Sequence, residues 1–459
     1  MKKTSIIIVA VILLIIAILP VVGNKFMQNY IQDAMSQVNK HGLKLESMKT
    51  DSGYLNTKKH LEFVIEDSSE FINYINTHAH KQLPTVTQSE LDGTVIGVDL
   101  KYSNIPFAKS INFDIYPLKL SKKVSDSLKT EDINFYNKFS AFLEEKGLLY
   151  HVDYNLINSK FKGYVKDINE VYKLQNSSDV TLKLLGVKFK GEGDLLSAKS
   201  IDSKIKMMRL EATQKGEHAL LSLEDFKENN TFVSFHDYKS AVEFEKMHFL
   251  VEGRHEDLNI SVEKLQTSSN AETNKERVTM KSHTAFKALN ISSKQLSLNV
   301  KKLNSDVTLK GLAQKPMEDI SNLLNKTTNI NAVAGQKEMQ EALLKLLEKG
   351  LEIDISDVSL ADLVVNEREN YGALKMNLNM VVNKDENISQ KVKMSPLLLL
   401  SNLKLDSNIK LSQMMYDKLV QNSPMAGVIS SYAKKEKKSV VFKIQLHDSK
   451  LYVNGKAIQ

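Results

Sequence analysis

The chain has 459 residues, of which 42% are hydrophobic and 25% are charged. This balance is typical of folded domains and argues against disorder over the whole length. The chain contains no cysteine, which excludes a disulfide framework, a thiolate zinc site and a cysteine nucleophile. The net charge of +7 is small for this length, and no basic stripe with interleaved aromatic residues is present, so we expect no nucleic-acid partner.

The first 42 residues predict a membrane anchor. Lys2 and Lys3 precede residues 5–22, an 18-residue run without charge. With its flanks, such a run is long enough to cross the hydrocarbon core of a bilayer, and leading lysines favour the cytoplasmic side. We therefore predict a cytoplasmic N-terminus at 1–4, a transmembrane signal anchor at 5–23 and an amphipathic juxtamembrane helix at 24–42.

A cleaved signal peptide is the alternative to an anchor. Cleavable signals have a shorter apolar region, followed by small residues at the cleavage site. Here the run is longer, and Val21 and Val22 occupy the positions where small residues are needed. The sequence therefore favours an uncleaved anchor with the bulk of the chain outside the cytoplasm.

Beyond residue 43 the dominant pattern is the alternation of apolar and polar residues. Alternation with a period of two is typical of antiparallel strands that have one apolar and one polar face. The clearest alternating sets are Ile111, Phe113, Ile115; Val152, Tyr154, Leu156; Val180, Leu182, Leu184; Leu296, Leu298, Val300; Leu351, Ile353, Ile355; Leu374, Met376, Leu378, Met380; Phe442, Ile444, Leu446; and Leu451, Val453.

Helical spacing of apolar residues interrupts these strands at 129–146, 316–326, 335–349, 411–422 and 424–436. Each of these segments has one apolar stripe, so each is expected to cover part of a sheet. The fold class is therefore α+β and mainly antiparallel β. We expect a first β-rich region at 43–315 that includes the helix at 129–146, and a helical hairpin region with a second β-rich region at 316–459.

No catalytic motif is present, so we expect that the protein is not an enzyme and that it binds no cofactor and no metal. The chain lacks the nucleophile elbow, the P-loop, the H-E-x-x-H zinc motif and a dinucleotide-binding glycine motif. His78 and His80 are spaced to share one face of a strand, but a metal site needs a third and a fourth ligand.

Two local patterns are candidate interaction sites. Lys434, Lys435, Lys437 and Lys438 form the densest basic cluster, which is either a solvated helix end or a contact with anionic lipid headgroups at a membrane surface. Asn387 lies in an Asp-x-Asn-x-Ser sequence that is similar to the acidic sequon of some bacterial N-glycosylation systems, so it is a candidate glycosylation site.

The order of these features resembles the YdgA-like family of bacterial envelope proteins of unknown function. The similar features are the lysine-led apolar segment, the alternating strands, and the motifs Ser52-Gly53-Tyr54-Leu55, Leu351-Glu352-Ile353-Asp354-Ile355 and Leu451-Tyr452-Val453-Asn454-Gly455-Lys456. The resemblance covers nearly the whole chain. It implies a single-pass protein of the bacterial inner membrane with its C-terminal bulk in the periplasm, and the family has no established catalytic residues to carry over to this chain.

Three functions remain open. The first is a non-enzymatic envelope assembly or lipid-contacting factor, in which an apolar sheet face that helices leave partly uncovered forms a groove for acyl chains. The second is an adaptor that pairs through its sheet edges with a second copy of the chain, as a homodimer, or with another envelope protein. The third is a hydrolase with a dispersed site. The expected partners are therefore the membrane, lipid, and a second copy or another envelope protein.

Overall fold

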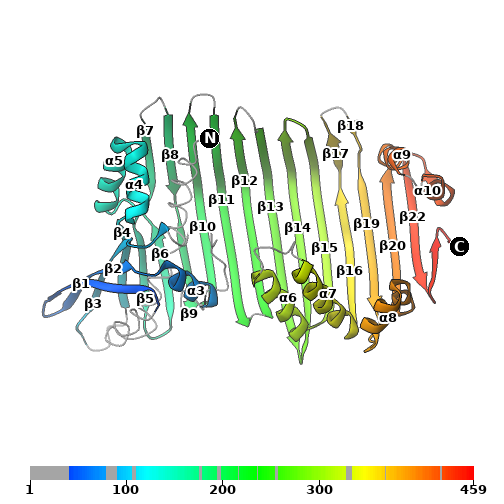
Figure 1. Ribbon diagram of the computed structural model, residues 1–459, viewed down its shortest axis with the longest axis horizontal. Helices are drawn as coiled ribbons and strands as arrows, with labels where there is room; N and C mark the ends of the chain where they lie inside the picture. Colours follow the sequence, from blue (N-terminus) through cyan, green and yellow to red (C-terminus); the bar gives the residue numbers. More distant parts are fainter. Residues whose placement is uncertain are drawn as a thin grey trace. The chain divides into compact units, whose positions relative to one another are not determined.

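The computed structural model describes residues 41–78, 90–105, 110–174, 178–193, 198–214, 217–234, 236–253, 257–326, 333–366, 369–423 and 426–458. The chain divides into two compact units. Figure 1 labels their helices and strands. Unit 1 contains Met1–Phe232 and Glu243–Asn259, and unit 2 contains Val233–Val242 and Ile260–Gln459. The predicted division at 315 and 316 falls inside unit 2.

The strands of unit 1 form an antiparallel meander. In the order β1-β2-β3-β4-β5-β6-β9-β10-β11 each strand pairs with the next, and the β7-β8 hairpin pairs with the C-terminal half of β10. The predicted strands around Phe113, Val152 and Leu182 are confirmed as β4, β5 and β8. The bounds are β1 Leu43–Ser52, β2 Asn56–Ile65, β3 Val95–Ser103, β4 Ser110–Lys119, β5 Tyr150–Asn155, β6 Lys160–Val165, β7 Ile168–Leu174, β8 Ser178–Leu185, β9 Lys188–Gly193, β10 Ala198–Gln214 and β11 Glu217–Ser234.

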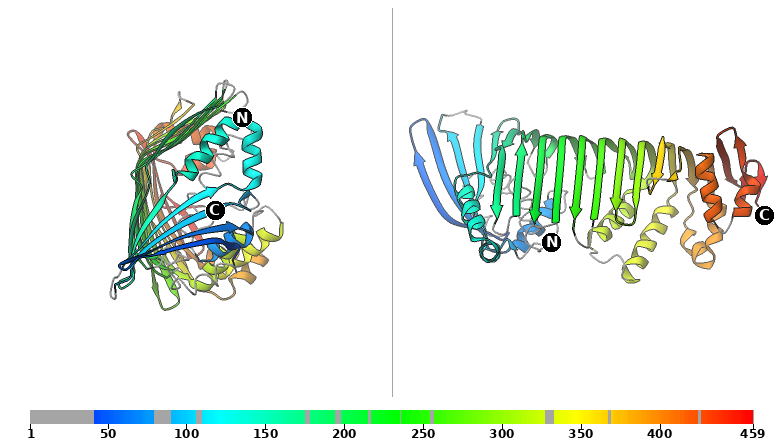
Figure 2. Two further views of the ribbon diagram at one scale, coloured as in Figure 1. Left: turned by 90° about the vertical axis from the view of Figure 1, so that its left-hand side faces the viewer. Right: turned by 90° about the horizontal axis from the view of Figure 1, so that it is seen from above.

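Three helices, α3 (Ser68–His78), α4 (Lys122–Glu131) and α5 (Ile133–Glu144), cover one face of the unit 1 sheet (Figure 2). The single helix expected at 129–146 is therefore two helices with a break at Asp132. That residue has an extended backbone (φ −158°), and its carboxylate accepts a hydrogen bond from the Phe135 amide at 2.9 Å. An Asp in this conformation is a strong N-cap, so it starts a new helix rather than continuing the old one.

Unit 2 is built on a second antiparallel meander. Its pairs run β14-β15-β16-β19-β20-β22-β23-β24, with β17 and β18 beside β15 and β21 beside β22. The strands predicted around Leu298, Ile353, Met376, Ile444 and Leu451 are confirmed as β15, β16, β19, β22 and β23. The bounds are β14 Arg277–Ser293, β15 Ser297–Ala313, β16 Leu351–Leu360, β17 Asp362–Val365, β18 Glu369–Asn370, β19 Leu374–Val382, β20 Leu403–Ser412, β21 Lys434–Glu436, β22 Ser439–His447, β23 Lys450–Val453 and β24 Lys456–Ala457.

The helices of unit 2 lie against one face of its sheet, near the ends of the strands (Figures 1 and 2). Three long strands, β11, β12 (Asp237–Glu252) and β13 (Asp257–Asn274), contribute residues to both units. The helix bounds are α6 Gln314–Lys326, α7 Val333–Glu348, α8 Ile388–Met394, η2 Pro396–Asn402 (a 3₁₀ helix), α9 Gln413–Asn422 and α10 Ala426–Tyr432.

A left-handed backbone conformation recurs along the chain at nearly constant spacing. The steps from Gly186 to Asp225, to Lys264 and to Lys302 are 39, 39 and 38 residues, and all four residues have φ between 51° and 64°. Each follows two apolar residues spaced two apart and precedes another apolar residue, as in Leu221-Ser222-Leu223-Glu224-Asp225-Phe226. The chain therefore contains a repeat of about two strands, which the sequence patterns alone did not establish.

The recurring conformation shifts the alternation of the strands by one residue. In β10, Ile201 and Ile205 occupy odd positions whereas Met208 and Leu210 occupy even positions, yet all four pack in the same core cluster. The change falls at Lys206, which lies opposite Asp225, and the register of β10 with β11 is the same on both sides of it, so the two strands change faces together. The recurring left-handed positions thus keep the apolar side chains on one face along strands of 16 to 18 residues.

The mainly antiparallel β part of the fold-class prediction is confirmed, but the transmembrane part is not. Across the described residues from 41 onward, no helix is long and apolar enough to cross a membrane. The predicted N-terminus at 1–4, the anchor at 5–23 and all but the last two residues of the helix at 24–42 lie outside the described residues. The predictions of a single-pass topology, a signal anchor and an inner-membrane location are accordingly withdrawn.

The helix expected at 424–436 is also corrected. Helix α10 ends at Tyr432, and Lys434–Glu436 forms β21, which pairs with the start of β22. Lys437 has a φ of 38°, so the chain turns here instead of continuing helically. Backbone pairing with β22 therefore overrides the helical spacing of the apolar residues that precede the lysines.

Candidate functional site

A partly uncovered apolar surface lies on the sheet of unit 2. We call it the apolar stripe, and it consists of two adjacent cross-strand rows on β14, β15, β16, β19, β20 and β22. From β14 to β22, the first row consists of Thr284, Ser305, Val358, Met376, Ile409 and Phe442. The second row consists of Ser282, Val307, Ile355, Leu378, Ser407 and Ile444.

Helices bury the sheet on one side of the apolar stripe. There Leu344 of α7 and Ile388 of α8 pack with strand residues such as Val278, Leu351 and Val382, all of them buried. The α7 residues Leu346 and Leu347 pack against the same cluster. The helix expected at 335–349 therefore covers the end of the sheet where β16 begins and β19 ends.

A second helix-covered cluster lies on the other side of the apolar stripe. Met415 and Tyr416 of α9 pack there with Leu411 and Val440, and Leu374 lies against them. Along β19 the even-numbered residues from Leu374 to Val382 alternate without interruption, so both clusters and the stripe share one face. The stripe is thus bounded at both ends of the strands by helices.

Between these clusters the side chains are only partly buried. Val307, Ile355, Val358, Met376 and Leu378 belong to neither buried cluster, and each is of intermediate exposure. The hydroxyl of Ser407 in the stripe donates to the Asn377 carbonyl at 2.8 Å, so this polar group is satisfied by the backbone. The arrangement presents aliphatic side chains without a charged group, and it is suited to contact with a hydrocarbon.

The opposite face of the same strands is polar. Lys310 contacts Glu352 at 2.8 Å, and this hydrogen bond lowers the pKa of the Glu352 carboxyl. Asp357 accepts a hydrogen bond from Asn304 at 2.8 Å, which lowers its pKa likewise. The sheet of unit 2 therefore separates its two faces by polarity, and only the helix-bearing face is apolar.

A histidine and carboxylate network lies on the polar face of unit 1. His60 is bound through Nδ1 to Asp99 at 2.7 Å and through Nε2 to Glu62 at 3.1 Å. Burial acts to lower the pKa of His60, but these two carboxylates outweigh it and raise the pKa above its ordinary value. Lys146 and Tyr116 also donate to Asp99, so burial of this carboxylate is outweighed and its pKa is lowered.

The neighbouring strands repeat this arrangement. His151 contacts Asp114 at 2.6 Å and Asp153 at 3.2 Å, and its ring stacks on Tyr164. In both histidines each ring nitrogen already has a carboxylate partner. Within the described part of the chain no group of three or more histidines and carboxylates is placed to hold a metal ion. The network is therefore suited to stabilising the sheet rather than to nucleophilic or metal chemistry.

The structure places the sequence-predicted site residues on separate elements. Lys434 and Lys435 lie on β21, and Lys437 and Lys438 form the turn to β22, all four exposed. His78 is the last residue of α3, and His80 lies outside the described residues. The basic cluster is thus a hairpin tip, not a helix end.

Asn387 lies at the start of α8 and is exposed. Its backbone amide donates to Asp385 at 2.9 Å, and the hydroxyl of Ser389, the third residue of the sequon, donates to Glu348. The predicted glycosylation site is therefore accessible at its asparagine, whereas its serine is engaged. Glycosylation itself stays a prediction.

The chain was compared with protein-family models and with curated proteins. No protein-family model matches it, and no curated protein matches it. The similarity to the YdgA-like family therefore rests on the sequence motifs alone and stays a prediction.

Proposed function

We propose that the protein is a non-enzymatic binding protein that holds the acyl chain of a lipid or fatty acid along the apolar stripe. The observation that carries this proposal is the pair of partly exposed aliphatic rows between two helix-covered clusters. Monomeric soluble proteins rarely expose large contiguous apolar patches, so a patch of this kind generally marks a binding site.

The dimensions of the stripe support an acyl chain as the ligand. Six paired strands at a spacing of about 4.8 Å span roughly 24 Å from the first strand to the last. One leaflet of a bilayer has a hydrocarbon thickness of about 15 Å, so an extended acyl chain fits along the rows. The absence of charged side chains in either row suits the methylene chain, because a buried charge without a partner is costly.

A fluorescent fatty acid such as 11-(dansylamino)undecanoic acid tests this proposal directly. The delipidated protein should bind the probe and increase its emission, and Leu378→Asp should weaken binding at least tenfold. A charge at this position faces the methylene chain, and a tenfold change corresponds to about 1.4 kcal/mol.

The neighbouring residue provides the matched control. Asn377 is next to Leu378 on β19, and the alternation of the strand directs it to the opposite face. Asn377→Asp adds the same charge and should leave binding unchanged. Equal affinities of wild type and Leu378→Asp, with both variants folded by circular dichroism, would rule out the stripe as the binding surface.

The alternative function, an adaptor that pairs with a partner through a sheet edge, has less support than acyl-chain binding. β1 has β2 as its one strand partner among the described residues, so its other edge is a candidate for addition of a strand. However, β1 contains a bulge between Leu45 and Ser47, and it carries Lys44, Lys49 and Asp51. Bulges and charges on an edge strand oppose edge-to-edge pairing.

A further inference from the structure

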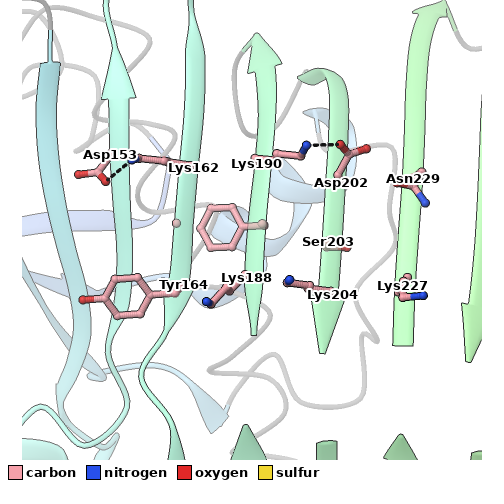
Figure 3. A pocket seen from close by; sticks show the side chains of 12 residues that line it. Asp153, Lys162, Tyr164, Lys188, Lys190, Asp202, Ser203, Lys204, Lys227 and Asn229 are labelled. Carbon is pink, nitrogen blue, oxygen red and sulfur yellow. Dashed lines mark ion pairs between the residues drawn. The ribbon is translucent and has the colours of Figure 1, made fainter. Parts of the chain in front are cut away.

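A groove of about 550 Å³ lies on the polar face of unit 1, remote in sequence from the apolar stripe. Strands β5, β6, β9, β10 and β11 form its floor. Figure 3 shows the lining side chains in two rows across these strands. The first row is Asp153, Lys162, Lys190, Asp202 and Asn229, and the second row is Tyr164, Lys188, Lys204 and Lys227.

Aromatic side chains on the core side hold this floor in place. Gly163 lies directly opposite Phe189, and a Cβ at Gly163 would be 2.2 Å from the Phe189 ring. Phe189 stacks in turn on Tyr150, with ring centroids 4.8 Å apart. The strands beneath the lysines are thus fixed by buried packing, and the lysine backbones have defined positions.

The two rows differ in how their charges are balanced. In the first row, Lys190 pairs with Asp202 at 3.4 Å and Lys162 approaches Asp153 at 3.9 Å. In the second row, Lys227 pairs with Glu243 at 2.6 Å. Lys188 and Lys204 make no ion pair with any residue of the described chain, and both are exposed. The unbalanced positive charge is therefore concentrated at these two lysines.

The register makes this concentration unfavourable in the absence of a ligand. Lys188 lies directly opposite Lys204, and Lys204 lies directly opposite Lys227. Directly opposed residues of antiparallel strands have Cβ atoms about 5 Å apart, and like charges in such pairs repel. An anion between the ammonium groups would remove this repulsion.

We infer that the groove is a binding site for a phosphate ester, with its phosphoryl group held between Lys188 and Lys204. A phosphate monoester carries a charge of about −1.5 to −2 at neutral pH and three acceptor oxygens, enough to accept from two lysines at once. Lysine is a common phosphate ligand because it acts as a mobile point charge. The exposed Tyr164, directly opposite Lys188, provides a further hydroxyl donor at the end of the row.

The phosphoryl group has two sources with the same chemistry, a soluble phosphate ester and a lipid headgroup. Two probes distinguish them at constant ionic strength, because exposed charges are screened by salt. The first is glycerol 3-phosphate, followed by isothermal titration calorimetry. The second is a set of vesicles of phosphatidylcholine with or without phosphatidic acid, whose headgroup is a phosphate monoester, followed by co-sedimentation. Binding of glycerol 3-phosphate identifies a soluble ester, and binding only to the anionic vesicles identifies a headgroup.

The Lys188→Gln/Lys204→Gln double variant should weaken binding of the effective probe at least tenfold. The matched control is Lys58→Gln/Lys101→Gln, which removes a directly opposed lysine pair from β2 and β3, outside the groove. That control should bind like wild type. Equal losses in both double variants would reveal a general charge effect and overturn the inference, as would the failure of wild type to bind either probe.

A stability measurement tests the same site without relying on affinity. Removing the opposed charges should raise the thermal midpoint of the Lys188→Gln/Lys204→Gln variant in phosphate-free buffer, because repulsion is relieved. Adding the effective probe should raise the midpoint of wild type and leave that of the variant unchanged. A variant midpoint that still rises with the probe would contradict the assignment.

Discussion

The core of unit 1 and the apolar stripe of unit 2 arise from the same alternating strand pattern, but they differ in how completely helices bury the apolar face of the sheet. In unit 1, Phe63, Phe113 and Phe135 are 0%, 1% and 2% exposed beneath α3, α4 and α5. In unit 2, Ile355 and Leu378 remain partly exposed because the helices pack at the ends of the strands. The comparison teaches that helix placement decides whether an apolar sheet face becomes a core or a binding surface.

The largest expected effect is the difference in stability loss between a substitution in the unit 1 core and a substitution in the apolar stripe. Phe135 packs between Phe139, at a ring-centroid distance of 5.6 Å, and the edge of Tyr172 at 5.1 Å. Phe135→Ala should therefore lower the free energy of unfolding by about 3–5 kcal/mol through lost burial and a cavity. Met376→Ala should cost only about 1 kcal/mol, since its side chain is already partly in water. Urea denaturation followed by circular dichroism measures both, and similar losses would erase the distinction.

The next effect concerns the left-handed backbone positions that recur along the chain. Gly186 has a φ of +64°, and a Cβ there would lie 2.9 Å from the Lys206 Cβ. Gly186→Ala should destabilise by about 2 kcal/mol, from the left-handed backbone and this contact together.

Gly93 separates these two causes. Its φ is +85°, and a Cβ there would meet nothing within 4 Å. Gly93→Ala should cost about 1 kcal/mol from the backbone alone. Thermal unfolding of both variants provides the measurement, and a larger loss at Gly93 than at Gly186 would refute the role of the contact.

A smaller effect tests the start of the helix that covers the unit 1 core. Asp132→Ala removes the hydrogen bond to the Phe135 amide and should cost about 1 kcal/mol of stability. Asp132→Asn keeps an acceptor oxygen and should cost only a few tenths of a kcal/mol. Chemical denaturation should rank the three proteins in that order, and no difference between Ala and Asn would show that the cap contributes nothing.

The smallest effect is a pH dependence on the polar face of unit 1. The pKa of His60 is raised, so its contribution is present below the ordinary value of 6.5 and is lost as the pH rises through the raised value. The pKa of Asp99 is lowered, so its contribution is present above the ordinary value of 3.8 and is lost as the pH falls through the lowered value. The network should be strongest between these ordinary values.

His60→Gln tests this dependence because it removes the titrating ring. The urea midpoint of wild type should fall between pH 6.5 and pH 8 by more than that of the variant. Asp99 is charged throughout this interval, so the difference isolates His60. Parallel profiles of the two proteins would argue against a contribution from the histidine.

The sequence predicted the positions of the strands better than it predicted which strand residues the helices bury. Alternation located β4, β16 and β19, because burial of one face imposes a period of two. The same pattern in Ile355 and Phe113 could not distinguish a partly exposed residue from one that is 1% exposed. Exposure depends on where distant helices pack, and no local spacing encodes that placement.

Other features were missed because they depend on pairing between strands. The opposition of Lys188 and Lys204 follows from the register of β9 with β10, which their separation of 16 residues in the sequence does not reveal. The left-handed positions recur every 38 to 39 residues, but three different residue types occupy them, so residue identity alone does not reveal the repeat. The helix expected at 424–436 ends at Tyr432, because strand pairing prevails from Lys434 onward.

The most direct test of the account uses the absence of tryptophan from the chain. Met376→Trp and Asn377→Trp introduce single tryptophans at adjacent positions of β19, on the apolar stripe and on the opposite face respectively. Addition of 9,10-dibromostearate to each delipidated protein should quench the emission of the Met376→Trp variant and leave that of the Asn377→Trp variant unchanged. Equal quenching of both, or quenching of neither, would contradict the proposal that the stripe holds an acyl chain.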